Sequence, residues 1–177
     1  NNVTAGALTA AENVTVVAGS NELTDNNASV TLTGAVDAKN IIATADADVT
    51  ANDTLTAGND IDVAAEGDVV LAAAATAAND IAIAGDDVTA DALTAVNVDI
   101  DADGTATLGN VVDADADANI DAEDIVVDAD VNAATVTLAA DNSISQTAGT
   151  ITAETGDAII DAEAGAIDLA GAVVATA

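Results

Sequence analysis

The stretch that decides the fold runs from residue 48 to residue 63 and reads Asp48-Val-Thr-Ala-Asn-Asp-Thr-Leu-Thr-Ala-Gly-Asn-Asp-Ile-Asp-Val63. Apolar residues alternate with polar ones in three short pieces, and Asn, Asp or Gly residues separate the pieces. Alternation with a period of two is the pattern of a β-strand with one buried face, and Asn, Asp and Gly favour turns. The stretch therefore predicts three short strands joined by corners.

The same template returns three more times, beginning at residues 2, 87 and 130, and the copy at 130 is the weakest match. Successive starts are 46, 39 and 43 residues apart. Each distance fits two turns of a coil of about 20 residues, which is a common size in parallel β-helices. We therefore predict an all-β fold, a single-stranded parallel β-solenoid (β-helix) of about eight coils, continuous over residues 1–177. The irregular spacing of the strand starts favours a right-handed helix.

Composition supports a thin interior. The chain has no Phe, Trp, Tyr, Met, Cys, Pro or His, yet 51% of its residues are hydrophobic. Ala, Val, Ile and Leu fill a narrow core at native density but not the middle of a thick domain. The net charge of -31 without aromatics is also typical of disordered chains. The alternating apolar triplets argue against disorder, because a solvated tail has no such pattern.

Several function classes are excluded by residue type. Without His or Cys the chain cannot build the usual zinc sites or nucleophilic triads. Its one basic side chain, Lys39, cannot hold a nucleic acid or an acidic glycan. No apolar run reaches the roughly 18–20 residues that span a membrane. We therefore expect a protein that is not an enzyme, does not bind nucleic acid and does not insert into a membrane.

Two acidic runs are candidate calcium ligands. Asp99, Asp101 and Asp103 precede Gly104 with the Asp-x-Asp-x-Asp-Gly spacing that opens a calcium-binding loop. An EF-hand would need Glu where Asn110 stands, and period-two alternation alternatively makes this run a solvated strand face. A second run would project carboxylates from one strand face if it is extended, with a solubilising surface as the alternative reading; its residues are Asp113, Asp115 and Asp117. Bound Ca²⁺ or high salt would reduce the repulsion between stacked carboxylates.

Asn residues stand one or two places before apolar strand starts. At such positions Asn tolerates a left-handed backbone and can hydrogen-bond to the backbone or to an Asn in the next coil. Ladders of Asn are therefore one interpretation, and ordinary turn residues are the other; the positions are Asn13, Asn40, Asn59, Asn79, Asn97, Asn110 and Asn119.

Two segments carry a resemblance to a known family. Leu55-Thr-Ala-Gly-Asn-Asp-Ile-Asp-Val63 and Ile81-Ala-Ile-Ala-Gly-Asp-Asp-Val-Thr-Ala90 resemble the repeats of filamentous-haemagglutinin-like large exoproteins and related bacterial β-helical adhesins. The likeness is one of repeat style, and the family's usual aromatic or Lys residues are missing. It implies an extracellular, cell-surface fibre or adhesin, for example in a biofilm matrix, whose partners are a host or neighbouring cell surface.

Neither end of the sequence carries an amphipathic helix or charged loop that would cover a terminal coil. We therefore expect either a segment of a longer repeat protein or a filament subunit that stacks head to tail on itself. The leading function is an extracellular structural or adhesive fibre component. The alternatives are an ice-binding solenoid with Thr-x-Thr rows and a halophilic, cation-binding surface-layer component.

Overall fold

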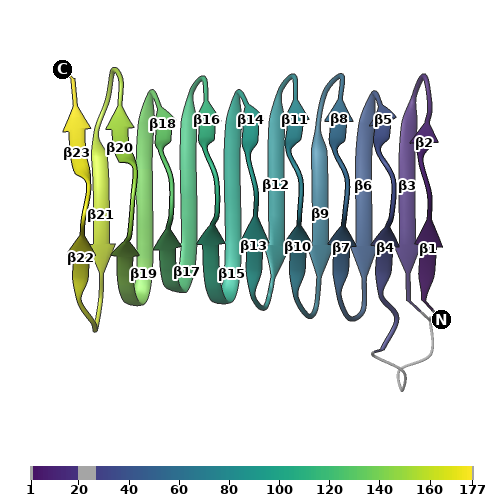
Figure 1. The fold of residues 1–177 in the computed structure, drawn as a ribbon, viewed down its shortest axis with the longest axis horizontal. Helices are drawn as coiled ribbons and strands as arrows, with labels where there is room; N and C mark the ends of the chain where they lie inside the picture. The colour runs from purple at the N-terminus through teal and green to yellow at the C-terminus, as the bar shows by residue number, and fades with distance from the viewer. Residues whose placement is uncertain (1, 20–26, 177) are drawn as a thin grey trace.

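The computed structural model describes residues 2–19 and 27–176, where every regular element is a β-strand. The strands stack into a rod, with the N-terminus at one end and the C-terminus at the other (Figure 1). Each full coil contributes one strand to each of three faces, which we number 1 to 3 in chain order. These described residues contain no helix long and apolar enough to cross a membrane. The predicted all-β solenoid is confirmed.

Each face is a row of short parallel strands. Face 1 consists of β1 (Val3–Ala5), β4 (Val30–Leu32), β7 (Val49–Ala51), β10 (Val69–Leu71), β13 (Val88–Ala90) and β22 (Ile167–Leu169). Face 2 consists of β2 (Leu8–Thr9), β5 (Val36–Ala38), β8 (Leu55–Ala57), β11 (Ala75–Ala77), β14 (Leu93–Ala95), β16 (Val112–Ala114), β18 (Val131–Ala133), β20 (Thr150–Ala153) and β23 (Ala172–Ala175). Face 3 consists of β3 (Asn13–Ala18), β6 (Asn40–Ala45), β9 (Ile61–Ala65), β12 (Asp80–Gly85) and β21 (Ala158–Ala162). Three long strands supply face 3 with their first half and face 1 with their second half: β15 (Asn97–Leu108), β17 (Asp117–Val127) and β19 (Thr135–Gln146).

The register fixes the coil length. Val49 pairs with Val69, and Val69 pairs with Val88, so these coils are 20 and 19 residues long. Nine strands stack on face 2, and the seven inner ones have a neighbour on both sides, in agreement with the expected number of coils. The strands of faces 1 and 2 run upward in front of the paler strands of face 3 while the coil advances leftward (Figure 1). This winding is right-handed, as predicted.

Small side chains fill the interior in rows. On face 2, Leu55 and Ala57 point inward while Thr56 between them is exposed. The inward position before the following corner is Ala in every coil from β5 to β20, because the corner leaves room for only a methyl group; the row is Ala38, Ala57, Ala77, Ala95, Ala114, Ala133 and Ala153. The absence of aromatic residues follows from this narrow cross-section.

The four copies of the template do not all lie on one face. Val3, Val49 and Val88 begin strands of face 1, as equivalent positions should. Val131, the corresponding residue of the weakest copy, lies on face 2, paired with Val112 and Ile151. The expected distance of two turns is therefore wrong for this copy, because two coils from Val88 lead to Ile125, one strand earlier.

The corners do not use the left-handed backbone expected of Asn. Among the described residues only Gly149 has a positive φ, of 77°. The Asn and Asp corners instead keep ordinary backbone angles, and hydrogen bonds to the neighbouring coil hold them, as when the Gly58 N–H donates to the Ala38 carbonyl. That part of the Asn prediction is wrong.

Candidate functional surfaces

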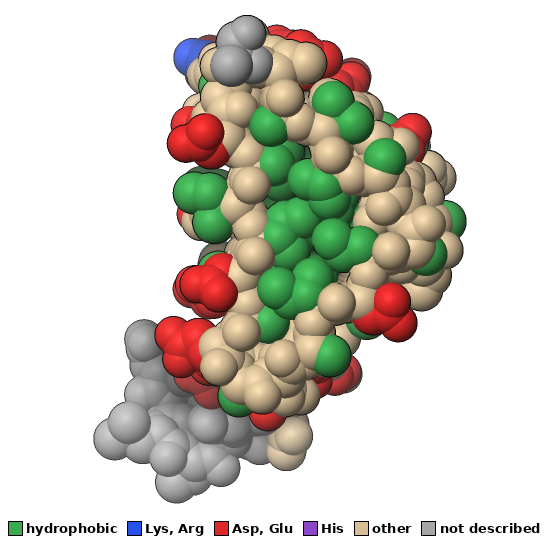
Figure 2. Space-filling view, turned by 90° about the vertical axis from the view of Figure 1, so that its left-hand side faces the viewer, with side chains coloured by type: hydrophobic (Ala, Val, Ile, Leu, Met, Phe, Trp, Pro, Cys, Tyr) green, Lys and Arg blue, Asp and Glu red, His purple; other side chains and the backbone are tan. Residues whose placement is uncertain are grey.

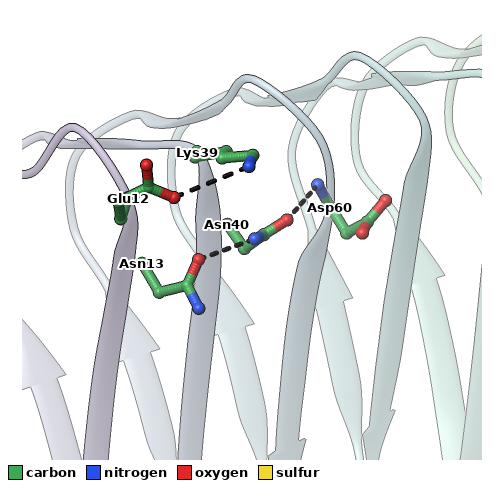
Figure 3. Close-up of polar contacts among 5 residues, drawn as sticks. All are labelled: Glu12, Asn13, Lys39, Asn40 and Asp60. Atoms are coloured by element: carbon green, nitrogen blue, oxygen red, sulfur yellow. Dashed lines mark hydrogen bonds and ion pairs between the residues drawn. The ribbon is translucent and has the colours of Figure 1, made fainter.

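An amide ladder begins at the N-terminal end of face 3. Asn40 Nδ2 donates to Asn13 Oδ1 at 2.7 Å, and the Asp60 N–H donates to Asn40 Oδ1 at 3.4 Å (Figure 3). Beside this ladder, Lys39 Nζ lies 3.5 Å from Glu12 Oε2. The one basic side chain of the protein therefore joins the first coil to the second.

Further along face 3 the ladder rungs join Asn to Asp. Asn97 Nδ2 donates to Asp80 Oδ1 at 2.7 Å, and Asn119 Nδ2 donates to Asp99 Oδ1 at 2.9 Å. The ladder interpretation of Asn is thus correct at these coils, although the partner is a carboxylate. Asn110 behaves as an ordinary turn residue, because its Oδ1 accepts the N–H of the next residue, Val111.

A second polar row, the corner ladder, precedes the strands of face 1. It consists of Ser29, Asp48, Asp68, Asp87 and Thr105. Each of its first four side chains accepts the backbone N–H of the next member, one coil away, over 2.7–3.4 Å. Three carboxylates of the ladder therefore satisfy backbone donors. Sequence reasoning missed this role, although Asp48 and Asp87 begin two copies of the template.

The first predicted calcium run is an outward strand edge. Asp99, Asp101 and Asp103 all lie exposed on β15, with the inward residues Val98, Ile100 and Ala102 alternating with them. Alternate residues of a strand are about 6.6 Å apart, too far for three such carboxylates to share one ion. The run thus has the geometry of the solvated face, and Asp101 stands in register with Asp121 of the next coil.

The second run is divided by a corner. Asp113 points outward from β16 on face 2, Asp115 lies in the corner, and Asp117 begins β17 on face 3. The three carboxylates therefore do not share one strand face. Within the part of the chain that the structure describes, no three acidic side chains converge as metal ligands. Calcium binding stays a prediction about the charged surface.

The deepest acidic hollow lies further along face 3. It has a volume of about 120 Å³ and forms where two Ala side chains leave space between carboxylates of neighbouring coils. The residues lining it are Asp121, Ala139, Ala140, Asp141, Asp161 and Glu163.

Threonine rows run along the outward sides of faces 1 and 2. On face 2, Thr56, Thr76 and Thr94 stand in register in three consecutive coils, with Ala74 and Ala92 beside them. On face 1 the outward row is Thr4, Thr31, Thr50, Val70, Thr89, Thr107, Val126 and Ser145. These are single rows, whereas the Thr-x-Thr pattern would need two rows side by side.

The chain was compared with family models, curated proteins and solved structures, and nothing matches it in any of the three. The resemblance to filamentous-haemagglutinin-like exoproteins therefore rests on repeat style alone.

Proposed function

We propose that this protein is a structural fibre component that associates end to end, with an acidic surface that cations stabilise. An extracellular location and adhesion to a host or neighbouring cell surface are part of the proposal and rest on the repeat style of residues 55–63 and 81–90. The association itself is supported by the geometry of the two end coils.

The observation that carries the proposal is the uncovered interior of the last coil. Ile167 on face 1 and Val173 on face 2 continue inward rows whose other members are buried, yet they are 45% and 40% exposed. The end-on view shows the apolar interior open at this end (Figure 2). A strand edge with exposed apolar side chains is a template for further strands.

The first coil is open as well. Its inward side chains Val3, Leu8 and Val14 are only half-buried, whereas the equivalent residues of the next coil are buried. They line a hollow of about 540 Å³ at the N-terminal end of the rod. Each end of the described solenoid therefore presents apolar side chains and a full set of strand edges.

Charge favours association through the ends over association through the sides. Residues 46–132 hold 22 of the 32 acidic residues, whereas residues 1–45 hold four acidic residues and Lys39. Two rods side by side would bring the dense carboxylates of their middle coils together. Repulsion of this kind keeps proteins apart laterally and is screened by salt.

Electron microscopy and fibre diffraction of the purified chain test the proposal. We expect thin filaments with a meridional repeat of about 4.8 Å, and none from a Val173→Asp variant, which places a carboxylate in the open interior. The matched control is Thr89→Asp, which adds the same charge to an exposed position in the middle of the rod. Compact particles from the unmodified chain would contradict the proposal. Dissolution of the filaments by a calcium chelator would assign the cation role to Ca²⁺.

Ice binding is a second candidate because the row of Thr56, Thr76 and Thr94 is regular and uncharged. Adjacent strands repeat every 4.7–4.9 Å or so, which gives a periodic array of hydroxyl and methyl groups. Thermal hysteresis measurements test it: activity should be lost in Thr76→Asp and kept in Thr89→Asp. An unmodified protein without hysteresis would exclude this function.

A further inference from the structure

We propose that the partner of each end is the opposite end of a second copy, in a defined register: the β1, β2 and β3 edges of one copy add to the β22, β23 and β21 edges of another. This inference rests on the proposed function and specifies the junction. It follows from the three rows of inward residues, each of which can continue across the junction without a change of face.

The inward rows match on all three faces. On face 1 the contact places Val3 against Ile167 and Ala5 against Leu169, as Val30 and Leu32 follow Val3 and Ala5 within the chain. On face 2 it places Leu8 against Val173, because these residues occupy the same row as Val36 and Ile151.

Face 3 matches over its longer strands. Ala158, Ile160 and Ala162 of β21 continue the inward row of β19, and the inward residues of β3 are Val14, Val16 and Ala18. Apolar side chains therefore meet apolar side chains at every inward position of the junction, and the hollow of the first coil is closed. All strands stay parallel, as they are within the rod.

The outward rows match without opposing carboxylates. Asp168 would stand against Thr4, and Asp161 against Val17, since these pairs occupy the same outward rows. Within the rod, by contrast, Asp101 stands directly against Asp121. Two carboxylates about 4.8 Å apart repel by about 0.9 kcal/mol in water. The junction is in this respect easier to form than the contact between two inner coils.

Mixed cross-linking of single-cysteine variants tests the register, because the chain has no Cys of its own. One preparation carries Thr4→Cys and the other Asp168→Cys; both positions are exposed, so the substitutions leave the interior unchanged. Paired Cα atoms of adjacent strands are about 4.8 Å apart, within the range that a disulfide spans. Oxidation of the mixture should give a reducible dimer on a non-reducing gel. The pair Thr15→Cys with Ile159→Cys should do the same on face 3.

The control mixture combines Thr9→Cys with Asp168→Cys, which lie on different faces and should yield at least tenfold less dimer. Equal yields from this mixture, or dimers mainly from Thr4→Cys alone or Asp168→Cys alone, would overturn the proposed register. If such yields accompany filaments in the microscope, the inference fails and the fibre function stands. If neither filaments nor dimers form, both fail.

Discussion

Ser143 stands one coil beyond Asp124, in register with it, and donates both its backbone N–H and its hydroxyl to the same carboxylate oxygen, Oδ1. The N–H lies 3.0 Å away, and Asn142 Nδ2 donates to the same group at 2.9 Å. These bonds, first the Ser143 hydroxyl and then the Asn142 amide, hold the pKa of Asp124 below its usual value of 3.8. The carboxylate therefore joins two coils most strongly when it is ionised.

Replacement of Asp124 by Asn should lower the free energy of unfolding at neutral pH. Because the folded pKa of Asp124 is depressed, its contribution is fully present above the unfolded value of about 3.8 and is lost as the pH falls through the folded value. The difference between the two proteins should thus shrink below pH 3.8 or so. Urea unfolding followed by far-UV circular dichroism across this range measures it. A difference that does not change with pH would contradict the assignment, and Ser143→Ala should weaken the dependence in the same way.

Asp101→Asn should have the opposite sign. Asp101 faces Asp121 across adjacent coils, so the substitution removes a like-charge contact. At low ionic strength we expect a gain of at most about 0.9 kcal/mol, which 1 M or so salt should abolish. Asp121→Asn relieves the same contact, and the double variant should therefore gain less than the sum of the two. Equal gains at low and high salt would show that repulsion is not the cause.

The alternation on face 2 predicts a large contrast between adjacent residues. Leu55 is 1% exposed, whereas Thr56 points outward on the same strand. Leu55→Ala should cost about 2–5 kcal/mol through lost burial and the cavity that remains. Thr56→Ala should change the stability by less than about 0.5 kcal/mol. Denaturant unfolding of both variants checks the contrast, and similar costs at the two positions would contradict the assigned register.

The fold could be predicted because alternation and turn residues are local signals that recur in every coil. The partners of each side chain could not, because they depend on the length of the intervening coil. Coils of 18–20 residues are indistinguishable in such a repetitive chain, so the copy beginning at residue 130 was assigned to the wrong face. The same uncertainty hid the corner ladder, whose bonds join residues 18–20 positions apart.

The acidic runs illustrate a second limit. Spacing alone indicated a calcium loop at Asp99, Asp101 and Asp103, but the same spacing suits a strand, where alternate side chains point outward in a line. The corner between Asp113 and Asp117 carries no Gly, Pro or Asn that would mark it. Ala116 stands there, and only the continuation of the inward rows on both sides requires the chain to turn.

Gly149 provides the sharpest test of a corner. Its φ of 77° is unfavourable for any residue with a Cβ, and a Cβ placed there would lie 2.2 Å from the carbonyl carbon of Ala129 in the neighbouring coil. Gly149→Ala should therefore strain the backbone and push two coils apart, at a cost of more than about 1 kcal/mol. Gly109→Ala is the matched control, because its φ is ordinary and its nearest contact would be the Ala90 carbonyl oxygen at 3.5 Å. We expect it to be neutral or stabilising, since Ala restricts the unfolded chain. Comparable stability of the two variants in urea would mean that the corner at Gly149 differs from the one described.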